Sequence, residues 1–194
     1  MVDFEFRYTR IDLEKAVTQG KRVHRLTVSP YLYAGDASQY ESGDVPNTVT
    51  RPGDYNDTRV SGFGLEVLDK YLLRRPDGML SNLYLAFGAG YHRIRLDYLG
   101  YVPVPFVEEG ATLFRFDFAN QQERIHRLDV VGLVGLKGRI RSSVLFLDFF
   151  AGPVLRNSWI DAPAGETKQH TGITDHGYDG VTFRAGMTIG ATLY

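Results

Sequence analysis

The end of the chain, residues 181–194, alternates strictly between apolar residues and small, polar or aromatic ones. An alternation with a period of two predicts a β-strand whose two faces differ. The stretch is far longer than the usual strand of about 5–6 residues, and such length is typical of a barrel wall. Its apolar face carries Val181, Phe183, Ala185, Met187, Ile189, Ala191 and Leu193.

Six further stretches show the same alternation. They predict strands over 2–9, 22–35, 60–71, 83–97, 126–137 and 143–156. Inside the second of these, Pro30 has no backbone N–H and therefore predicts a bulge or a local loss of pairing. The polar segment 10–21 separates the first two strands and could form a short helix through Ile11, Leu13, Ala16 and Val17.

The connections between these strands differ in length in a regular way. Long ones over 36–58, 98–125 and 157–179 alternate with short ones, so in an antiparallel order all three leave from one end. Outer-membrane barrels have this asymmetry, with short periplasmic turns and long outer loops. Within 98–125, the alternation over 111–119 predicts a strand that extends beyond the barrel wall. Its phenylalanines, Phe114, Phe116 and Phe118, could form an adhesive surface or, as we favour, an aromatic girdle.

The composition narrows this interpretation. The 194 residues suffice for one domain, 1–194, with a sizeable interior. A formal net charge of −1 gives no reason to expect nucleic acid as a partner. The lack of cysteine excludes disulfides and thiolate metal sites. A mean hydropathy of −0.21 does not exclude a membrane, because only every second residue of a spanning strand faces lipid.

In a membrane barrel the apolar faces of the strands point to the lipid and the polar faces point to the interior. On this basis we expect one apolar outer band, with membrane lipid as its partner. The band comprises Val2, Phe4, Phe6, Phe63, Leu65, Val67, Val130, Val134, Leu145, Leu147, Phe149, Phe183, Met187 and Ile189.

The opposite faces carry a nearly balanced set of charges. We expect these charges to form an ion-pair network in the interior, because a buried charge is tolerated only when it is paired and hydrogen-bonded. Glu66 and Asp148 are predicted as its acidic centre. The full set is Asp3, Glu5, Arg7, Glu66, Arg93, Arg95, Asp129, Asp148, Arg156 and Arg184. The strand over 83–97 is ambiguous, because its apolar face continues into Arg93 and Arg95.

Five segments spread over nearly the whole chain share a form in which bulky apolar residues are interleaved with glycine or charged residues. They are 4–10 (FEFRYTR), 62–67 (GFGLEV), 83–88 (LYLAFG), 147–153 (LDFFAGP) and 184–190 (RAGMTIG). Through them the chain resembles the small, eight-stranded OmpA/OmpX-like outer-membrane β-barrel proteins of Gram-negative bacteria, and within these a subgroup of uncharacterised barrels. The resemblance implies an antiparallel up-and-down barrel in the outer membrane, with no established activity.

The number and direction of the strands predict that a part of the barrel precedes this sequence. Bacterial single-chain barrels have an even number of strands, whereas seven are predicted here. Counted back from a periplasmic Tyr194, the strand over 2–9 also runs inward, so an outward strand and a signal peptide should come before it. We then expect an open seam between 2–9 and 181–194. In a rival arrangement, 111–119 supplies the eighth wall strand.

The expected function is a structural or surface-interaction role without catalysis, in a monomer. The segments 36–58, 98–125 and 157–179 could bind a surface ligand. Side chains can fill the interior of an eight-stranded barrel, so no general pore is expected. One alternative is a soluble lipocalin-like barrel, whose apolar faces would point inward around an apolar ligand. Another is a lipid-modifying outer-membrane enzyme.

The histidines are the main candidates for chemistry. A lipid-modifying enzyme needs a histidine with a serine and a carboxylate. The nearest pairs are His24 with Ser29 and His126 with Asp129. Neither forms a recognised motif, so no catalytic residue and no cofactor are expected. The segment around His176 also holds several aspartates, but the spacing fits no metal-ligand pattern, so no metal site is expected.

Overall fold

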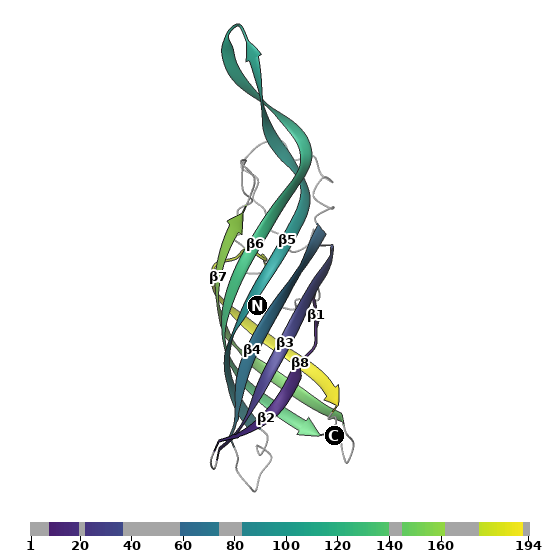
Figure 1. The fold of residues 1–194 in the computed structure, drawn as a ribbon, viewed down its shortest axis with the longest axis vertical. Coiled ribbons are helices and arrows are strands. Elements are labelled where there is room, and N and C mark those ends of the chain that lie inside the picture. Colours follow the sequence, from purple (N-terminus) through teal and green to yellow (C-terminus); the bar gives the residue numbers. More distant parts are fainter. Residues whose placement is uncertain are drawn as a thin grey trace.

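The chain forms one antiparallel β-sheet (Figure 1), which a computed structural model describes over residues 8–19, 22–36, 59–73, 83–139, 145–161 and 175–191. The strands are β1 (Tyr8–Arg10), β2 (Leu13–Gln19), β3 (Arg22–Asp36), β4 (Arg59–Leu72), β5 (Leu83–Glu108), β6 (Ala111–Arg139), β7 (Leu145–Asp161) and β8 (Gly180–Ala191). The predicted all-β, antiparallel class is confirmed. Within the described residues there is no helix that is long and apolar enough to cross a membrane.

The described sheet is open. Its strands follow the order β1, β3, β4, β5, β6, β7, β8, and β2 also pairs with β3. The expected closure into a barrel is therefore not observed, although the sheet curls strongly. In Figure 1, β8 passes behind β3 and β4, and an ion pair between Arg184 of β8 and Glu66 of β4 joins the two sides across the concave face. Residues 1–7, which include most of the first predicted strand, lie outside the described residues.

The break between β1 and β2 lies opposite Pro30. Both short strands follow one continuous register along β3, and the Ile11 N–H donates to the Pro30 carbonyl at 3.3 Å. Because Pro30 has no N–H with which to return a bond, the ladder is interrupted there. The predicted local loss of pairing is confirmed on this side. On the β4 side Pro30 pairs with Leu65 in a continuous register, without a bulge.

The helix considered for residues 10–21 is wrong. β2 pairs with β3 along its whole length. Ile11 and Leu13 are exposed, whereas Asp12 and Glu14 bond to side chains of the concave face. This alternation has the period of a strand. The ladder to β3 and these contacts outweigh the weak helical tendency of a short polar segment.

β5 and β6 form a hairpin that projects past the other strands (Figure 1). Their pairing continues to Glu108, which lies opposite Ala111. Glu109 and Gly110 form the turn with φ angles of 50° and 80°, and two-residue type I′ turns require positive φ at both positions. The segment 98–125 is therefore a two-stranded ribbon, not mostly a loop. The strand predicted over 111–119 is confirmed, and it pairs with β5 rather than supplying another wall strand.

The strand ends confirm that the three segments predicted as long connections leave from one end, although 98–125 is a ribbon closed by a two-residue turn. Because neighbouring strands are antiparallel, the β3–β4 and β7–β8 connections leave from the same end of the sheet as the β5–β6 turn. We call this the hairpin end. The connections from β2 to β3, from β4 to β5 and from β6 to β7 lie at the opposite end, which we call the short end.

Apolar and charged layers alternate along the concave face. Its positions on β4 run from Val60 through Glu66 and Leu68 to Lys70, all of them buried. One apolar cluster lies toward the hairpin end and contains Tyr31, Tyr33, Val60, Ile94, Leu96 and Ile125. The other lies toward the short end and contains Leu68, Tyr84, Ala86, Val131, Leu133 and Val154. Most of the buried charged residues occupy the levels between and below these clusters, whereas Glu123 lies beyond the hairpin-end cluster.

Candidate functional site

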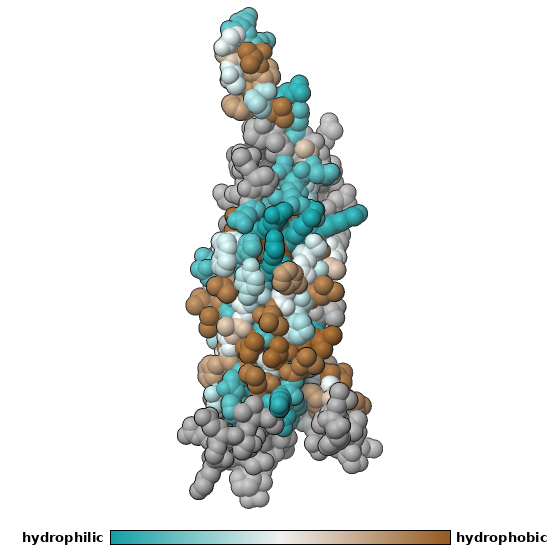
Figure 2. Space-filling model, in the orientation of Figure 1, coloured by the Kyte–Doolittle hydropathy of each residue, from teal (hydrophilic) through white to brown (hydrophobic). Residues whose placement is uncertain are grey.

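The two faces of the sheet have opposite character. Charged side chains are buried on the concave face, and Glu66, Arg127 and Asp129 are 0% exposed. The convex face exposes large hydrophobic side chains, such as Phe63 and Met187 at 56% each. In Figure 2, hydrophobic residues gather in a band below a hydrophilic zone. A protein folded in water normally buries its apolar residues and exposes its charges, so this arrangement is inverted.

Glu66 is a centre of the first charge cluster on the concave face. Its Oε2 accepts a hydrogen bond from Arg184 Nη1 at 2.6 Å, and its Oε1 accepts one from the Tyr31 hydroxyl at 3.1 Å. Arg10 Nη2 lies 3.6 Å from Oε1. Three strands other than β4, namely β1, β3 and β8, thus supply partners to one carboxylate. The burial of an ionised group requires such partners.

Asp129 on β6 is the second carboxylate of this cluster. Its oxygens lie 3.3 Å from Arg127 Nε, 3.9 Å from Arg156 Nε and 3.6 Å from Arg184 Nη2. Arg184 therefore bridges Glu66 and Asp129. One guanidinium can do this because its planar fork presents several donors to different acceptors.

His92 completes the cluster from β5. Its Nδ1 is hydrogen-bonded to the Tyr33 hydroxyl at 2.8 Å, and its Nε2 lies 3.4 Å from Asp129 Oδ2. The ring fits beside β4 because its cross-strand neighbour is Gly64, where an added Cβ would lie 2.1 Å from His92 Nδ1. The same Tyr33 hydroxyl accepts a bond from Arg127 Nη2 at 3.1 Å.

The interrupted edge of the sheet joins this cluster through Asp12. Ser29 Oγ donates to Asp12 Oδ1 at 2.6 Å, and Arg10 Nε donates to the same oxygen at 2.5 Å. Arg10 also lies over the ring of Phe150, 5.8 Å from its centroid. Since Phe150 belongs to β7, side chains of the first and seventh strands meet inside the curled sheet.

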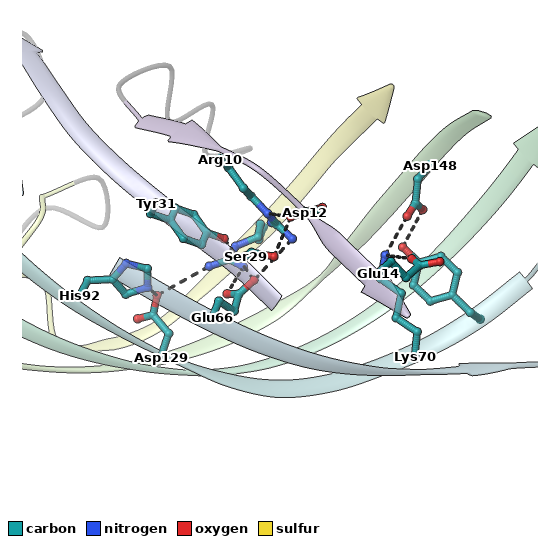
Figure 3. Close-up of polar contacts among 12 residues, drawn as sticks. Arg10, Asp12, Glu14, Ser29, Tyr31, Glu66, Lys70, His92, Asp129 and Asp148 are labelled. Carbon is teal, nitrogen blue, oxygen red and sulfur yellow. Dashed lines mark hydrogen bonds and ion pairs between the residues drawn. The ribbon is translucent and has the colours of Figure 1, made fainter. Parts of the chain in front are cut away.

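A second charge cluster lies at the short end, apart from the first (Figure 3). Glu14 Oε1 accepts bonds from Lys137 Nζ at 2.8 Å and Arg25 Nη1 at 2.6 Å. Lys70 Nζ donates to Glu14 Oε2 at 3.3 Å and to Asp148 Oδ2 at 2.9 Å. The Tyr84 hydroxyl donates to Asp148 Oδ1 at 2.7 Å. The cluster therefore ties β2, β3, β4, β5, β6 and β7 together.

The predicted interior charges divide into four groups, the last of which, Arg93 and Arg95, is on the convex face. Those brought together at the first cluster are Glu66, Asp129, Arg156 and Arg184, whereas Asp148 belongs to the second cluster. Glu66 and Asp148 are thus not one acidic centre, because the apolar layer with Leu68 lies between their levels. Asp3, Glu5 and Arg7 lie outside the described residues.

The interior assignment of Arg93 and Arg95 is wrong. Both are exposed on the convex face, where Arg95 pairs with Asp97 at 2.8 Å. The concave positions of β5 are the even-numbered residues, including His92 and Ile94. From the alternation alone, either face of this strand could point inward. Packing of the apolar even-numbered residues against the interior clusters decides between them.

Several members of the two clusters were missed from the sequence. They are Arg10, Asp12, Glu14, Arg25, Lys70, Tyr84, His92, Arg127 and Lys137. For some of them a signal exists: Arg127 is two positions from Asp129, and Lys70 is on the same face as Glu66 in a period of two. His92 is on the strand over 83–97, whose inward face could not be assigned from the alternation. Glu14 lies in the segment for which a helix was considered.

Most of the residues predicted for the apolar outer band are exposed on the convex face. These are Phe63, Leu65, Val67, Val130, Val134, Leu145, Phe149, Phe183, Met187 and Ile189. Leu147 is only partly exposed. Val2, Phe4 and Phe6 lie outside the described residues. Phe87, Leu128, Leu155 and Val181 extend the same exposed surface.

The histidine pairs considered for catalysis do not form. His24 Nδ1 bonds to Asp69 at 2.7 Å, whereas Ser29 is buried on the opposite face against Asp12. His126 and Asp129 are likewise on opposite faces. In the described part of the chain, no group of three His, Cys, Asp or Glu residues could hold a metal ion. The buried charges therefore hold the curled sheet together and fill its interior.

Comparisons with protein-family models, with curated proteins and with solved structures found no match for this chain.

Proposed function

We propose that this chain is an outer-membrane β-barrel protein with a packed interior, and that its role is structural or lies in surface interaction at the hairpin end. The observation that carries the proposal is the inverted polarity of the sheet. Ion-paired charges are on the inside and large hydrophobic side chains are on the outside. Lipid is the surroundings in which such an outer surface is stable.

The outer surface is too apolar for a monomer in water. Neighbouring exposed residues across the register, such as Val67, Ala89, Val130, Leu155 and Val181, form a continuous row over five strands. Soluble monomers rarely expose contiguous apolar patches of more than a few hundred Å². Toward the hairpin end, the exposed positions of β4, β5 and β6 carry the charged residues Arg59, Arg95 and Arg124. Such a change is expected where a barrel wall leaves the bilayer.

The interior argues against a general pore. Charged layers are closed by ion pairs such as Lys70–Asp148, and apolar layers with Leu68 and Val131 separate them. An ion moving along the axis would meet apolar side chains with no group to replace its hydration. We therefore propose a structural wall rather than a channel.

The hairpin end supports a surface role. The β5–β6 ribbon projects beyond the sheet, and Val107 and Phe114 near its tip are 74% and 61% exposed. These apolar side chains are exposed although they lie away from the apolar band of the wall. We propose that they bind a surface ligand. The segments 36–58 and 157–179 remain the other candidates for this role.

The soluble lipocalin-like alternative needs an apolar interior. Here Glu66, Arg127 and Asp129 are fully buried, while Phe63 and Met187 are exposed. This arrangement favours the membrane proposal. The lipid-modifying alternative needs a serine and a histidine in contact, and in the described residues Ser29 and His24 are on opposite faces.

The test is whether the chain requires an amphiphile. We expect purified protein to be folded and monomeric in detergent micelles, by circular dichroism and light scattering, and to float with liposomes after reconstitution. We expect aggregation once detergent is removed without lipid. A folded monomer that persists in detergent-free buffer would contradict the proposal, and planar-bilayer recordings that show a large steady conductance would contradict the packed interior.

A further inference from the structure

We infer that the convex face at the hairpin end of the apolar band binds the phosphate group of an anionic lipid headgroup. Arg93 and Arg124 supply the charge, and Tyr91, His126 and Trp159 form an aromatic platform beside Arg93 and one step below Arg124. This inference rests on the proposed membrane location. It adds a specific lipid partner for residues that the membrane proposal itself leaves unexplained.

The aromatic platform is a built feature of β5, β6 and β7. The rings of His126 and Trp159 stack with centroids 5.7 Å apart and an interplanar angle of 7°. The Tyr91 hydroxyl bonds to His126 Nδ1 at 2.6 Å, and its ring centroid is 6.5 Å from that of Trp159. Tyrosine and tryptophan favour the headgroup level of a bilayer, where one end of the side chain is apolar and the other is wet.

The register places Arg93 level with this platform and Arg124 one step beyond it toward the hairpin end. Arg93 lies opposite His126, and Arg95 lies opposite Arg124. On the other side of Tyr91 along β5, convex positions are apolar, as at Phe87. The change from apolar to cationic therefore takes place within one step along the strand. This is the level at which lipid phosphates lie when the apolar band is in the bilayer.

The acids nearby do not neutralise these arginines. Arg95 is bonded to Asp97 at 2.8–3.0 Å. Partial burial alone would raise the pKa of Asp97, but hydrogen bonds from Arg95 and Gln122 outweigh it and lower the pKa, so this carboxylate is ionised and engaged. Asp161 faces Arg124 across β6 and β7, but within the described residues its ion pair is with His126 Nε2, at 3.4 Å.

Arg93 and Arg124 are therefore left for an external anion. Both are exposed, and neither forms an ion pair within the part of the chain that the structure describes. Arg124 also directly faces Arg95, and like charges opposite each other across an antiparallel pair are unfavourable. A phosphate between these strands would relieve that repulsion. Its oxygens match the fork of a guanidinium, which binds phosphate through two parallel hydrogen bonds.

Trp159 allows a direct test, because it is the only tryptophan in the chain. The full chain is reconstituted in phosphatidylcholine bilayers that contain a small fraction of lipid brominated near the headgroup end of its acyl chain. The quencher is either brominated phosphatidic acid or brominated phosphatidylcholine. We expect stronger quenching by phosphatidic acid, with a preference of about fivefold for each arginine at low salt.

Matched variants separate the site from general charge. The Arg93→Gln/Arg124→Gln variant should lose the preference, so that both lipids quench equally. Arg115→Gln removes an exposed arginine of the hairpin that is paired with Asp117, and it should leave the preference unchanged. Circular dichroism of each variant shows whether it is folded. All three substitutions are at exposed positions, so folding should be retained.

Each outcome is decisive. Equal quenching by the two lipids in the wild-type chain overturns this inference while leaving the membrane proposal intact. Absence of quenching by either lipid overturns the membrane proposal itself. A preference that persists in excess inorganic phosphate supports a lipid-borne ligand. If inorganic phosphate abolishes the preference while chloride at the same ionic strength leaves it intact, the site takes free phosphate and the assignment to a lipid headgroup is wrong.

Discussion

Arg184 on β8 and Glu66 on β4 form an ion pair with an Nη1–Oε2 distance of 2.6 Å, although 118 residues separate them in the chain. β8 pairs with β7 on one side and has no backbone partner on the other within the described residues. The guanidinium of Arg184 also lies 3.6 Å from Asp129. Side-chain charge thus contributes, across the concave face, to holding the last strand in the curled sheet.

Removal of either partner should therefore be strongly destabilising. Glu66→Gln and Arg184→Gln should each lower the free energy of unfolding by about 3–5 kcal/mol, because each leaves a buried charge without its partner. The double variant should lose less than the sum. Urea unfolding in micelles, followed by circular dichroism, measures this.

The matched control is Arg95→Gln, which breaks an exposed ion pair with Asp97. Its cost should stay below about 1 kcal/mol, because water screens both charges. If the losses in Glu66→Gln and Arg184→Gln simply add, the two residues do not act as a buried pair.

A methyl group at Gly64 should disturb His92. The added Cβ would lie 2.1 Å from His92 Nδ1, so Gly64→Ala should cost about 1–3 kcal/mol of unfolding free energy through overpacking. Gly132→Ala is the control, since its Cβ would meet only Phe87 Cδ1 and Cε1 at 3.9 Å. Thermal unfolding in detergent compares them. Equal midpoints for the two variants would show that the space beside His92 is not limiting.

A charge in the apolar band should prevent insertion. Met187→Arg should cost about 2–4 kcal/mol if its side chain lies near the bilayer midplane. Val107→Arg, near the tip of the ribbon, should have little effect because that side chain is exposed beyond the wall. The fraction of protein folded after dilution from urea into liposomes gives the comparison. Equal folded fractions would count against a lipid-facing Met187.

An N–H at residue 30 should restore the pairing that is interrupted between β1 and β2. Pro30→Val restores an N–H opposite Ile11, whose own N–H already donates to residue 30. One added backbone hydrogen bond should raise the free energy of unfolding by about 0.5–1.5 kcal/mol. Hydrogen exchange at residues 11–13 should slow. Unchanged exchange there would mean that proline is not the cause of the break between β1 and β2.

The alternation of residues was sufficient to predict most of the wall. The convex positions of β4, β6, β7 and β8 were identified because apolar residues there strictly alternate with polar or small ones, as at Phe63 and Met187. The inward face of β5 could not be assigned, because both of its faces mix apolar and basic residues, and the interior placement of Arg93 and Arg95 was wrong. Periodicity sets which residues share a face, but only packing with neighbours sets which face is inward.

The pairing within the interior could not be predicted in the same way. Arg184 meets Glu66, rather than another acid, because of the curl of the whole sheet, and no local pattern specifies that. One strand of the ribbon, the partner of the correctly predicted 111–119, was missed for a different reason. This strand, over 98–108, contains Pro103 and Pro105, which usually argue against a paired strand, whereas both have cross-strand neighbours here.

The length of the β5–β6 ribbon sets the distance between its tip and the rest of the sheet. Beyond Asp97 and Gln122, β5 and β6 pair only with each other, up to Glu108 and Ala111. At about 3.4 Å per residue, the arm from Asp97 to Glu108 reaches roughly 37 Å. The Debye length at physiological ionic strength is about 8 Å. A partner held at the tip would therefore be electrically independent of charges at the membrane surface, and salt should alter binding at the two places separately.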